Sequence, residues 1–285
     1  MTAIQQGSSQ QGTEAQQARD AWDAIAPAYD EVVTPGNILH AEQPLRAVGL
    51  RAGERFLDVA CGSGALAVPA ARLGAEVVAV DFAPTFVERL DQRARREGLD
   101  NLQARVMDGH ALDLPDDSFD VSGSQHGVSL FPDMPRALAE MVRVTKPGGR
   151  VLLVAFGDIR KAEFLSYFIG AAKSVVPDFA GLPLDTPPLP FQCADTGVMA
   201  AALTAAGLRD VTIEQTTWRM PFQSAEQYWQ WITSSNPIGR RLAGALTQEQ
   251  GAEVRRVLDG MLRERADGGG AAELHADVNI GIGTA

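Results

Sequence analysis

Short apolar runs and amphipathic stretches alternate along the first two thirds of the 285-residue chain. Runs rich in β-branched residues predict strands, and apolar residues at helical spacing predict the helices that follow them. The predicted strands are residues 55–60, 76–80, 102–107, 119–122 and 150–156, and the predicted helices are residues 65–73, 86–97 and 135–144. This alternation predicts an α/β fold, a doubly wound parallel sheet with helices on both faces.

Beyond residue 157 the pattern is less regular. Residues 158–193 hold a helical stretch and then a proline-rich segment, and residues 222–270 predict further helices with a cluster of aromatic residues. A helix at 196–206 and strands at 211–217 and 274–282 are expected around them. Ligands of open parallel sheets bind beyond the C-terminal ends of the strands, so we expect the two long segments to form lids there.

The N-terminal residues differ in composition from the rest. Residues 1–14 are rich in Gln, Ser and Gly and are expected to form a disordered tail. A helix is predicted from Ala15 to just before Pro27, with Trp22 in the core and Tyr29 in the following loop. The predicted organisation is a single domain over 15–285, with lid insertions at 158–193 and 222–270.

Composition and charge narrow the class of protein. The chain has 25 basic and 36 acidic residues, a net charge of −11, and lacks the clustered Lys and Arg that neutralise phosphates, so no nucleic-acid partner is expected. No apolar run approaches the roughly 18 residues of a membrane span. Cys61 and Cys193 match no metal or redox spacing. We expect a cytoplasmic protein with a small-molecule partner and no metal, of an oligomeric state that the sequence does not determine.

The most informative motif is LDVACGSG at residues 57–64. A strand that ends in small residues and turns directly into a helix brings backbone N–H groups close to a ligand, although a purely structural turn has the same pattern. Asp81 and Asp108 end or follow the next two strands and therefore reach the same edge of the sheet. A carboxylate there can accept hydrogen bonds from both hydroxyls of a ribose, while a turn or helix cap is the alternative role.

Two ligand classes fit this edge of the sheet. The glycines at 62 and 64 satisfy the dinucleotide fingerprint G-x-G-x-x-A, and Asp81 suits a nicotinamide cofactor as well. However, Asp58 precedes the glycines and would repel a pyrophosphate. Together with Asp81 and Asp108 it favours a nucleoside that carries a positive charge. An NAD-dependent oxidoreductase remains the alternative.

The segment from Phe56 to Gly157 resembles the class I S-adenosylmethionine-dependent methyltransferases of the ubiquinone-biosynthesis-like type (methyltransferase type 11). The matching pieces, in the order of the family, are LDVACGSG at 57–64, VVAVDFAPTFVERL at 77–90, MDGHALDLPDDSFD at 107–120 and LFPDMPRALAEMVRVTKPGGRVLLVAF at 130–156. The family usually has glycine at the position of Ala60. The resemblance implies a Rossmann-like, seven-stranded sheet whose last strand is antiparallel and inserted between the fifth and sixth.

The resemblance also implies S-adenosylmethionine as cofactor, S-adenosylhomocysteine as product, and roles for individual residues. Asp58 would order the loop that contains Gly62 and Gly64, called the glycine loop below. Asp81 would accept hydrogen bonds from the ribose, and Asp108 would accept one from the adenine amino group. Tyr29 would cover the cofactor, and Gln125 would face its methionine chain. The implied cofactor-binding residues are Tyr29, Asp58, Ala60, Gly62, Gly64, Asp81, Phe82, Asp108, Gly109, His110, Ser124 and Gln125.

Methyl transfer from a sulfonium is an in-line displacement that depends on positioning and on excluding water, with a base needed only where the nucleophile must lose a proton. His126, directly after the fourth strand, is the candidate catalytic base because an ordinary pKa of about 6.5 would let it take a proton at neutral pH. A polar contact is its alternative role. The aromatic lids predict a small hydrophobic or aromatic metabolite, methylated on O, N or C. A non-catalytic protein of the same fold is a further alternative.

Overall fold

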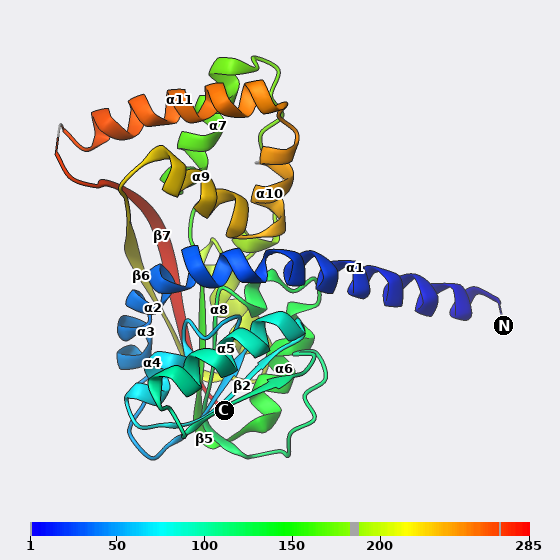
Figure 1. Cartoon of the computed structure of the whole chain (residues 1–285). Helices are drawn as coiled ribbons and strands as arrows, with labels where there is room; N and C mark the ends of the chain where they lie inside the picture. The colour runs from blue at the N-terminus through cyan, green and yellow to red at the C-terminus, as the bar shows by residue number, and fades with distance from the viewer. Residues whose placement is uncertain (1, 183–187, 268) are drawn as a thin grey trace.

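The computed structural model describes residues 2–182, 188–267 and 269–285, and its centre is one seven-stranded sheet in the order β3-β2-β1-β4-β5-β7-β6 (Figure 1). The strands are β1 Arg55–Val59, β2 Glu76–Asp81, β3 Leu102–Val106, β4 Phe119–Gln125, β5 Thr145–Phe156, β6 Arg209–Phe222 and β7 Ala272–Thr284. The pairings among β1 to β5 are parallel, whereas β7 runs antiparallel to both β5 and β6. The doubly wound sheet and its inserted antiparallel last strand are therefore confirmed.

Helices cover both faces of this sheet. One apolar layer joins the sheet to α3 (Glu42–Ala47), α4 (Ala67–Arg72) and α5 (Pro84–Glu97), and the other joins it to α6 (Met134–Val144) and α8 (Thr196–Ala205). The prediction of β4 was too short, because its end at residues 123–125 is made of Gly, Ser and Gln. This end is held by its pairing with β5 rather than by strand propensity.

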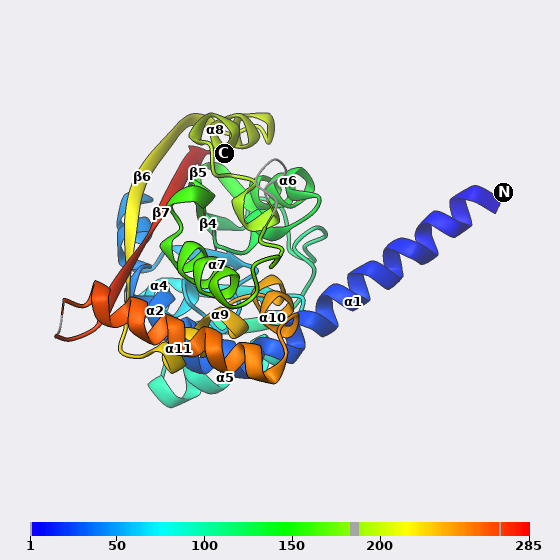
Figure 2. The same ribbon diagram turned by 90° about the horizontal axis from the view of Figure 1, so that it is seen from above.

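The first helix, α1 (Thr2–Val32), differs from the prediction at both ends. It continues through Pro27, because the buried Ile25 and Ala26 and the packing of Tyr29 on Phe86 outweigh the cost of a proline inside a helix. It also includes residues 2–14, where a disordered tail was expected. Figures 1 and 2 both show this N-terminal part projecting away from the rest of the molecule.

The two predicted lid segments pack together at one end of the sheet. They contain α7 (Glu163–Val175), α9 (Ala225–Ser234), α10 (Pro237–Gly244) and α11 (Gln248–Arg265), which share one apolar cluster with the ends of β6 and β7 (Figure 1). Residues 183–187 of the first segment lie outside the described residues. α1 contacts α9 and α10 as well as α5, so it lies between the lids and the sheet layer.

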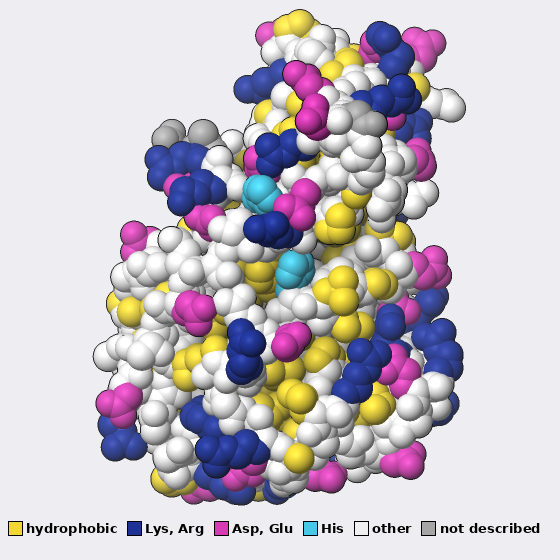
Figure 3. Space-filling view, turned by 90° about the vertical axis from the view of Figure 1, so that its left-hand side faces the viewer, with side chains coloured by type: hydrophobic (Ala, Val, Ile, Leu, Met, Phe, Trp, Pro, Cys, Tyr) yellow, Lys and Arg dark blue, Asp and Glu magenta, His cyan; other side chains and the backbone are white. Residues whose placement is uncertain are grey.

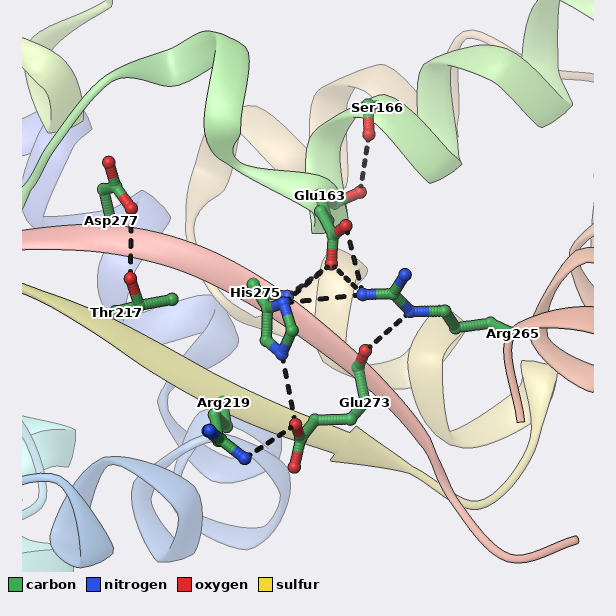
Figure 4. A network of polar contacts seen from close by, with 8 residues as sticks. All are labelled: Glu163, Ser166, Thr217, Arg219, Arg265, Glu273, His275 and Asp277. Atoms are coloured by element: carbon green, nitrogen blue, oxygen red, sulfur yellow. Dashed lines mark hydrogen bonds and ion pairs between the residues drawn. The ribbon is translucent and has the colours of Figure 1, made fainter. Parts of the chain in front are cut away.

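A polar network attaches the lids to the two antiparallel strands (Figure 4). Glu163, at the start of α7, accepts from the backbone N–H of His275 on β7 at 2.7 Å and pairs with Arg265 of α11 at 3.0 Å. His275 Nε2 also lies 3.1 Å from Glu273. The groups are half-exposed, so each pair contributes little stability alone. Together they fix the start of α7 and the end of α11 against β7.

Charges of both signs are interspersed on the face of the molecule shown in Figure 3, with no large area of one sign. Within the described parts of the chain, no helix is both long and apolar enough to cross a membrane. The same residues contain no group of three or more His, Cys, Asp or Glu side chains placed to hold a metal ion.

Candidate active site

A cavity of about 580 Å³ opens where β1, β2 and β4 end, and α1 closes it on the lid side. Its size lies in the range of small-molecule sites. Of the residues predicted to bind a cofactor or to catalyse, those that line it are Tyr29, Ala60, Gly62, Asp81, Phe82, Asp108, His110, Gln125 and His126. The structure thus gathers residues from five separate chain segments at one edge of the sheet.

The glycine loop is held open to the cavity by its backbone conformation. Ala60 and Gly62 both have left-handed φ angles, 57° and 52°. The N–H of Gly62 donates to Asp81 Oδ2 at 2.9 Å, so the end of β2 fixes the loop after β1. A Cβ at Gly62 would meet no atom nearer than 3.9 Å, where Phe86 and Tyr29 lie. Its small size therefore matters for the cavity and for φ, rather than for packing.

Asp81 is buried, and the groups around it offset the charge of its carboxylate only in part. It is only 6% exposed, and its oxygens accept from the N–H groups of Gly62 and, at 3.0 Å, Ala83. Burial raises the pKa of Asp81 to about 6; the two N–H groups limit this rise, and the charge of Asp23 adds to it. Each oxygen still has a lone pair for a ligand hydroxyl.

Four predicted residues support the cavity wall from behind instead of lining it. Asp58 is 1% exposed, its Oδ2 has no partner, and burial raises its pKa well above the ordinary value. The Ser124 hydroxyl donates to the carbonyl of Val59 at 2.8 Å and accepts from a loop N–H. Gly64 and Gly109 are needed for close packing, because a Cβ on either would approach side chains within 3 Å.

At the end of the cavity beside β3, neighbouring groups offset the negative charge of Asp108. Burial opposes ionisation of Asp108, but its backbone and ring contacts with His110, at 2.9 and 2.8 Å, together with the charge of Arg136, hold the pKa of Asp108 below its ordinary value. The His110 ring lies against Phe131, with 4.5 Å between ring centroids. Phe131 and Arg136 also line the cavity. This end offers a carboxylate, an aromatic surface and backbone groups, as a purine requires.

A second, smaller chamber adjoins the cavity under the lids. The two share Trp22, Tyr29, His126 and Leu130 as a common wall. Its other described lining residues are apolar or uncharged: Val33, Asn37, Ser129, Phe156, Phe164, Leu165, Leu182, Pro188, Pro190, Phe191, Trp231, Ile232, Ser235, Asn236, Ile238, Gly239 and Leu242. Trp22 was expected in the core; it is partly buried against Ala26, Ala83 and Phe86, and it also lines both spaces.

His126 occupies the junction with an unusual backbone conformation. Its φ is 53°, which aims the ring into the shared wall. The ring stacks on Phe156 at 4.2 Å and meets the Trp218 ring edge-on at 4.7 Å, and both of its nitrogens are buried without a partner. Burial, with a smaller effect of His40, lowers the pKa of His126 to about 3. The imidazole is therefore neutral at neutral pH, and the ordinary pKa assumed from the sequence was wrong.

Asn37, on the short helix α2 (Thr34–Leu39), is a site residue that the sequence did not indicate. Its side chain donates to the Tyr29 hydroxyl at 3.3 Å, and its carbonyl accepts from Gln125 at 3.0 Å. Burial raises the pKa of Tyr29 to about 12. Asn37 thus joins α1 to the end of β4. No local motif marks it, because the link exists only after α1 packs on the sheet.

Comparisons with known proteins agree with this geometry. The sequence model of a family described as "Methyltransferase domain" matches residues 57–153. An uncharacterised protein of Mycobacterium tuberculosis is 41% identical over 128 residues, which are 45% of this chain and 44% of that protein. The chain therefore spans less than half the length of the first relatives it matches. Nocamycin O-methyltransferase of Saccharothrix syringae is 30% identical over 231 residues, 74% of this chain and 79% of that enzyme.

The fold has solved relatives as well. The structure of Haemonchus contortus phosphoethanolamine N-methyltransferase 2, in complex with phosphomonomethylethanolamine and S-adenosylhomocysteine, aligns with a TM-score of 0.57 at 17% identity. The alignment covers 92% of this chain and 57% of the other. At this level of identity the likeness establishes the shared fold alone.

Proposed function

The chain belongs to the class I S-adenosylmethionine-dependent methyltransferases, and on that premise we propose that it methylates a small, uncharged, hydrophobic or aromatic metabolite. The proposal places S-adenosylmethionine in the cavity at the ends of β1, β2 and β4, and the methyl acceptor in the chamber under the lids. It places the protein in the cytoplasm, which suits two buried cysteines that are both free.

The observation that carries the proposal is the shared wall of the two spaces. Methyl transfer requires a donor and an acceptor to meet in line and away from water. Trp22, Tyr29, His126 and Leu130 face both the cavity and the chamber, so ligands in the two spaces would meet beside them. The described lining of the chamber has no charged side chain. An ionised acceptor would therefore lose its hydration without gaining an ion partner.

The residues of the chain then have separate tasks. When bound, S-adenosylmethionine supplies an electrophilic methyl group on a positively charged sulfur. Asp81 would hold the ribose, Asp108 and His110 the adenine end, and Tyr29 with Trp22 would exclude water from the junction.

His126 would orient the acceptor and take its proton where the nucleophile is a hydroxyl. A neutral imidazole offers one donor and one acceptor, and both of these atoms lack partners here. Because burial lowers its pKa to about 3, the ring is uncharged throughout the neutral range and is a weak base, so it would accept the proton only as the acceptor atom bonds to the methyl carbon. We therefore expect no inflection in the methylation rate between pH 5 and 8 that arises from His126. An inflection in that interval that disappears in a His126→Phe variant would contradict this assignment.

Binding and turnover test the proposal separately. Calorimetry should show that the purified protein binds S-adenosylmethionine and S-adenosylhomocysteine but not NAD. Formation of S-adenosylhomocysteine is then measured with neutral, cationic and anionic members of one aromatic series, such as naphthols, aminomethylnaphthalenes and naphthoates. Turnover confined to neutral members supports the proposal. Tight NAD binding without binding of S-adenosylmethionine would favour an oxidoreductase. Binding of S-adenosylmethionine without turnover of any acceptor would favour a non-catalytic protein.

Removing the imidazole nitrogens should separate catalysis from cofactor binding. His126→Phe keeps a flat ring between Phe156 and Trp218, so the fold is expected to survive. With a hydroxyl acceptor we expect methylation to slow by about 10²- to 10⁴-fold, with unchanged affinity for the cofactor. His40→Phe is the matched control, since His40 stacks on Trp218 at 4.2 Å but lines neither space. Equal rates in both variants and the wild type would exclude His126 as the base.

A further inference from the structure

Two residues in the wall of the cofactor cavity have a backbone conformation that most side chains disfavour. Among the residues that the structure describes, five residues other than glycine have left-handed φ angles, and three of them are aspartates, which adopt this conformation more readily than most. The other two are Ala60, at 57°, and His126, at 53°. They directly follow β1 and β4, which pair side by side in the sheet, and both line the cavity. Alanine has no polar side-chain atom to bond to its own backbone, so its conformation has to be stabilised by contacts with the rest of the fold.

The methyl group of Ala60 lies against the backbone of Gly127. A Cβ added to Gly127 would lie 2.6 Å from Ala60 Cβ, 2.8 Å from the Ala60 carbonyl oxygen and 2.9 Å from Ser124 Oγ. The Ser124 hydroxyl joins the same two segments, since it donates to the carbonyl of Val59 at 2.8 Å and accepts from the N–H of Val128 at 2.9 Å. The start of the glycine loop and the turn after β4 are therefore in direct contact.

The contacts that hold the turn after β4 differ in how much they depend on the residue at position 60. The N–H of His126 donates to the carbonyl of Val154 on β5 at 2.9 Å, and Ser124 bonds to backbone groups of both segments. All of these bonds would form equally with glycine at position 60, which adopts a left-handed φ at no steric cost. The contact of the methyl group with Gly127 is thus what alanine adds over glycine, and it is added at a conformational cost.

We propose that Ala60 is a positioning residue for methyl transfer: its methyl group, seated against Gly127, holds the turn after β4 so that the His126 imidazole keeps its place between the cavity and the chamber. The inference rests on the proposed function, in which His126 orients the acceptor and takes its proton. Because Gly127 adjoins His126 in the chain, a shift of Gly127 changes the direction of the His126 side chain. Proton removal and in-line attack depend on placement, so loss of the contact should slow the reaction rather than weaken binding.

Rates measured without the methyl group test this role. Ala60→Gly should lower kcat for a hydroxyl acceptor, such as a naphthol, by about tenfold, which is part of the roughly hundredfold cost of a displacement of about 1 Å. KM for the acceptor, and the affinity for S-adenosylmethionine measured by calorimetry, should stay within about threefold of the wild type. In the His126→Phe background the same substitution should leave kcat nearly unchanged, because the group that the methyl group positions is absent.

A second measurement needs neither acceptor nor cofactor. Amide hydrogen exchange of the free protein, followed by NMR, reports how firmly the turn is held. In Ala60→Gly we expect the amides of His126 and Val128 to exchange faster, on the order of tenfold, while the amides of β5 keep their wild-type rates. The melting temperature should not fall, because glycine relieves the left-handed conformation of alanine at position 60.

Asp117→Gly is the matched control. Asp117 has a φ of 51°, is exposed, and lies just before β4, at the end of that strand away from the cavity. The substitution also replaces a left-handed residue with glycine, so the melting temperature should likewise not fall. However, kcat and the exchange of the His126 and Val128 amides should stay as in the wild type.

The outcomes separate this inference from the proposed function. A wild-type kcat in Ala60→Gly would overturn the inference, and so would an equal loss of rate with and without His126, which would mean that Ala60 acts on the cofactor instead. Unchanged exchange at His126 and Val128, or a lower melting temperature with faster exchange throughout the sheet, would show that the methyl group only packs the wall. Failure of the wild type to bind S-adenosylmethionine or to methylate any acceptor would overturn the proposed function itself, and hydrogen exchange would still decide whether the methyl group holds the turn.

Discussion

Replacing Asp81 with alanine is expected to weaken binding of S-adenosylmethionine by about a hundredfold or more. Hydrogen bonds to a charged group contribute roughly 1.5–3 kcal/mol each, and the loss of the two bonds proposed between Asp81 and the ribose corresponds to at least this factor. The substitution also frees the N–H groups of Gly62 and Ala83, which the carboxylate now holds at 2.9 and 3.0 Å. The glycine loop would then lose its attachment to β2.

Calorimetry with both forms of the cofactor measures this effect, and circular dichroism checks that the variant folds. Asp120→Ala is a suitable control, because Asp120 is the second residue of β4, at the end of that strand away from the cavity, and pairs with Lys146 at 2.6 Å. That variant should bind the cofactor as the wild type does. Retention of wild-type affinity by a folded Asp81→Ala protein would show that the cofactor does not depend on this carboxylate.

The second large effect concerns stability: Gly64→Ala should destabilise the fold by about 2–4 kcal/mol, which lowers the melting temperature by about 5–10 °C. Gly64 has a φ of 97°, and an added Cβ would lie 2.4 Å from Leu90 Cδ1 and 2.9 Å from Val68 Cγ2. Both neighbours are fully buried, so neither can move aside without disturbing the core.

A matched glycine isolates the packing part of that cost. Gly98 ends α5 with a φ of 67°, but nothing lies within 4 Å of the Cβ it would gain. Gly98→Ala should therefore cost only the backbone contribution, about 1 kcal/mol. Thermal or urea unfolding of both variants gives the comparison. Equal losses of stability in the two variants would mean that Leu90 and Val68 move aside easily from the added Cβ. Gly64 would then be required only for its backbone conformation.

These two residues also show how far the sequence could be interpreted at the site. The sequence pattern correctly placed Asp81 at the end of a strand and Gly64 in the turn that opens a helix. It assigned the small size of Gly64 to close approach of a ligand, whereas the structure shows that Leu90 of α5 occupies the space. A glycine motif looks the same in either case, because the sequence does not show which neighbour needs the room.

The first helix, α1, shows a different limit of prediction from the sequence. Pro27 and the polar composition of residues 1–14 predicted a short helix between a tail and a loop, whereas α1 runs from Thr2 to Val32. What they omit is the surface formed by Phe86 and the lids, on which Trp22 and Tyr29 pack. Contacts between segments so distant in sequence leave no local pattern, so neither the continuation of α1 through Pro27 nor the contact of Trp22 with Phe86 was predictable.

The sequence by itself determined the order of strands and helices, the antiparallel last strand that its family resemblance implied, and the carboxylates that meet at the sheet edge. These follow from periodicity and from the geometry of parallel strands, which are local or topological. Only the tertiary structure decided the charge state of the site. Burial makes His126 neutral and leaves Asp81 half-protonated near pH 6, because the free energy of an ionised group depends on the solvent and charges around it in the folded protein.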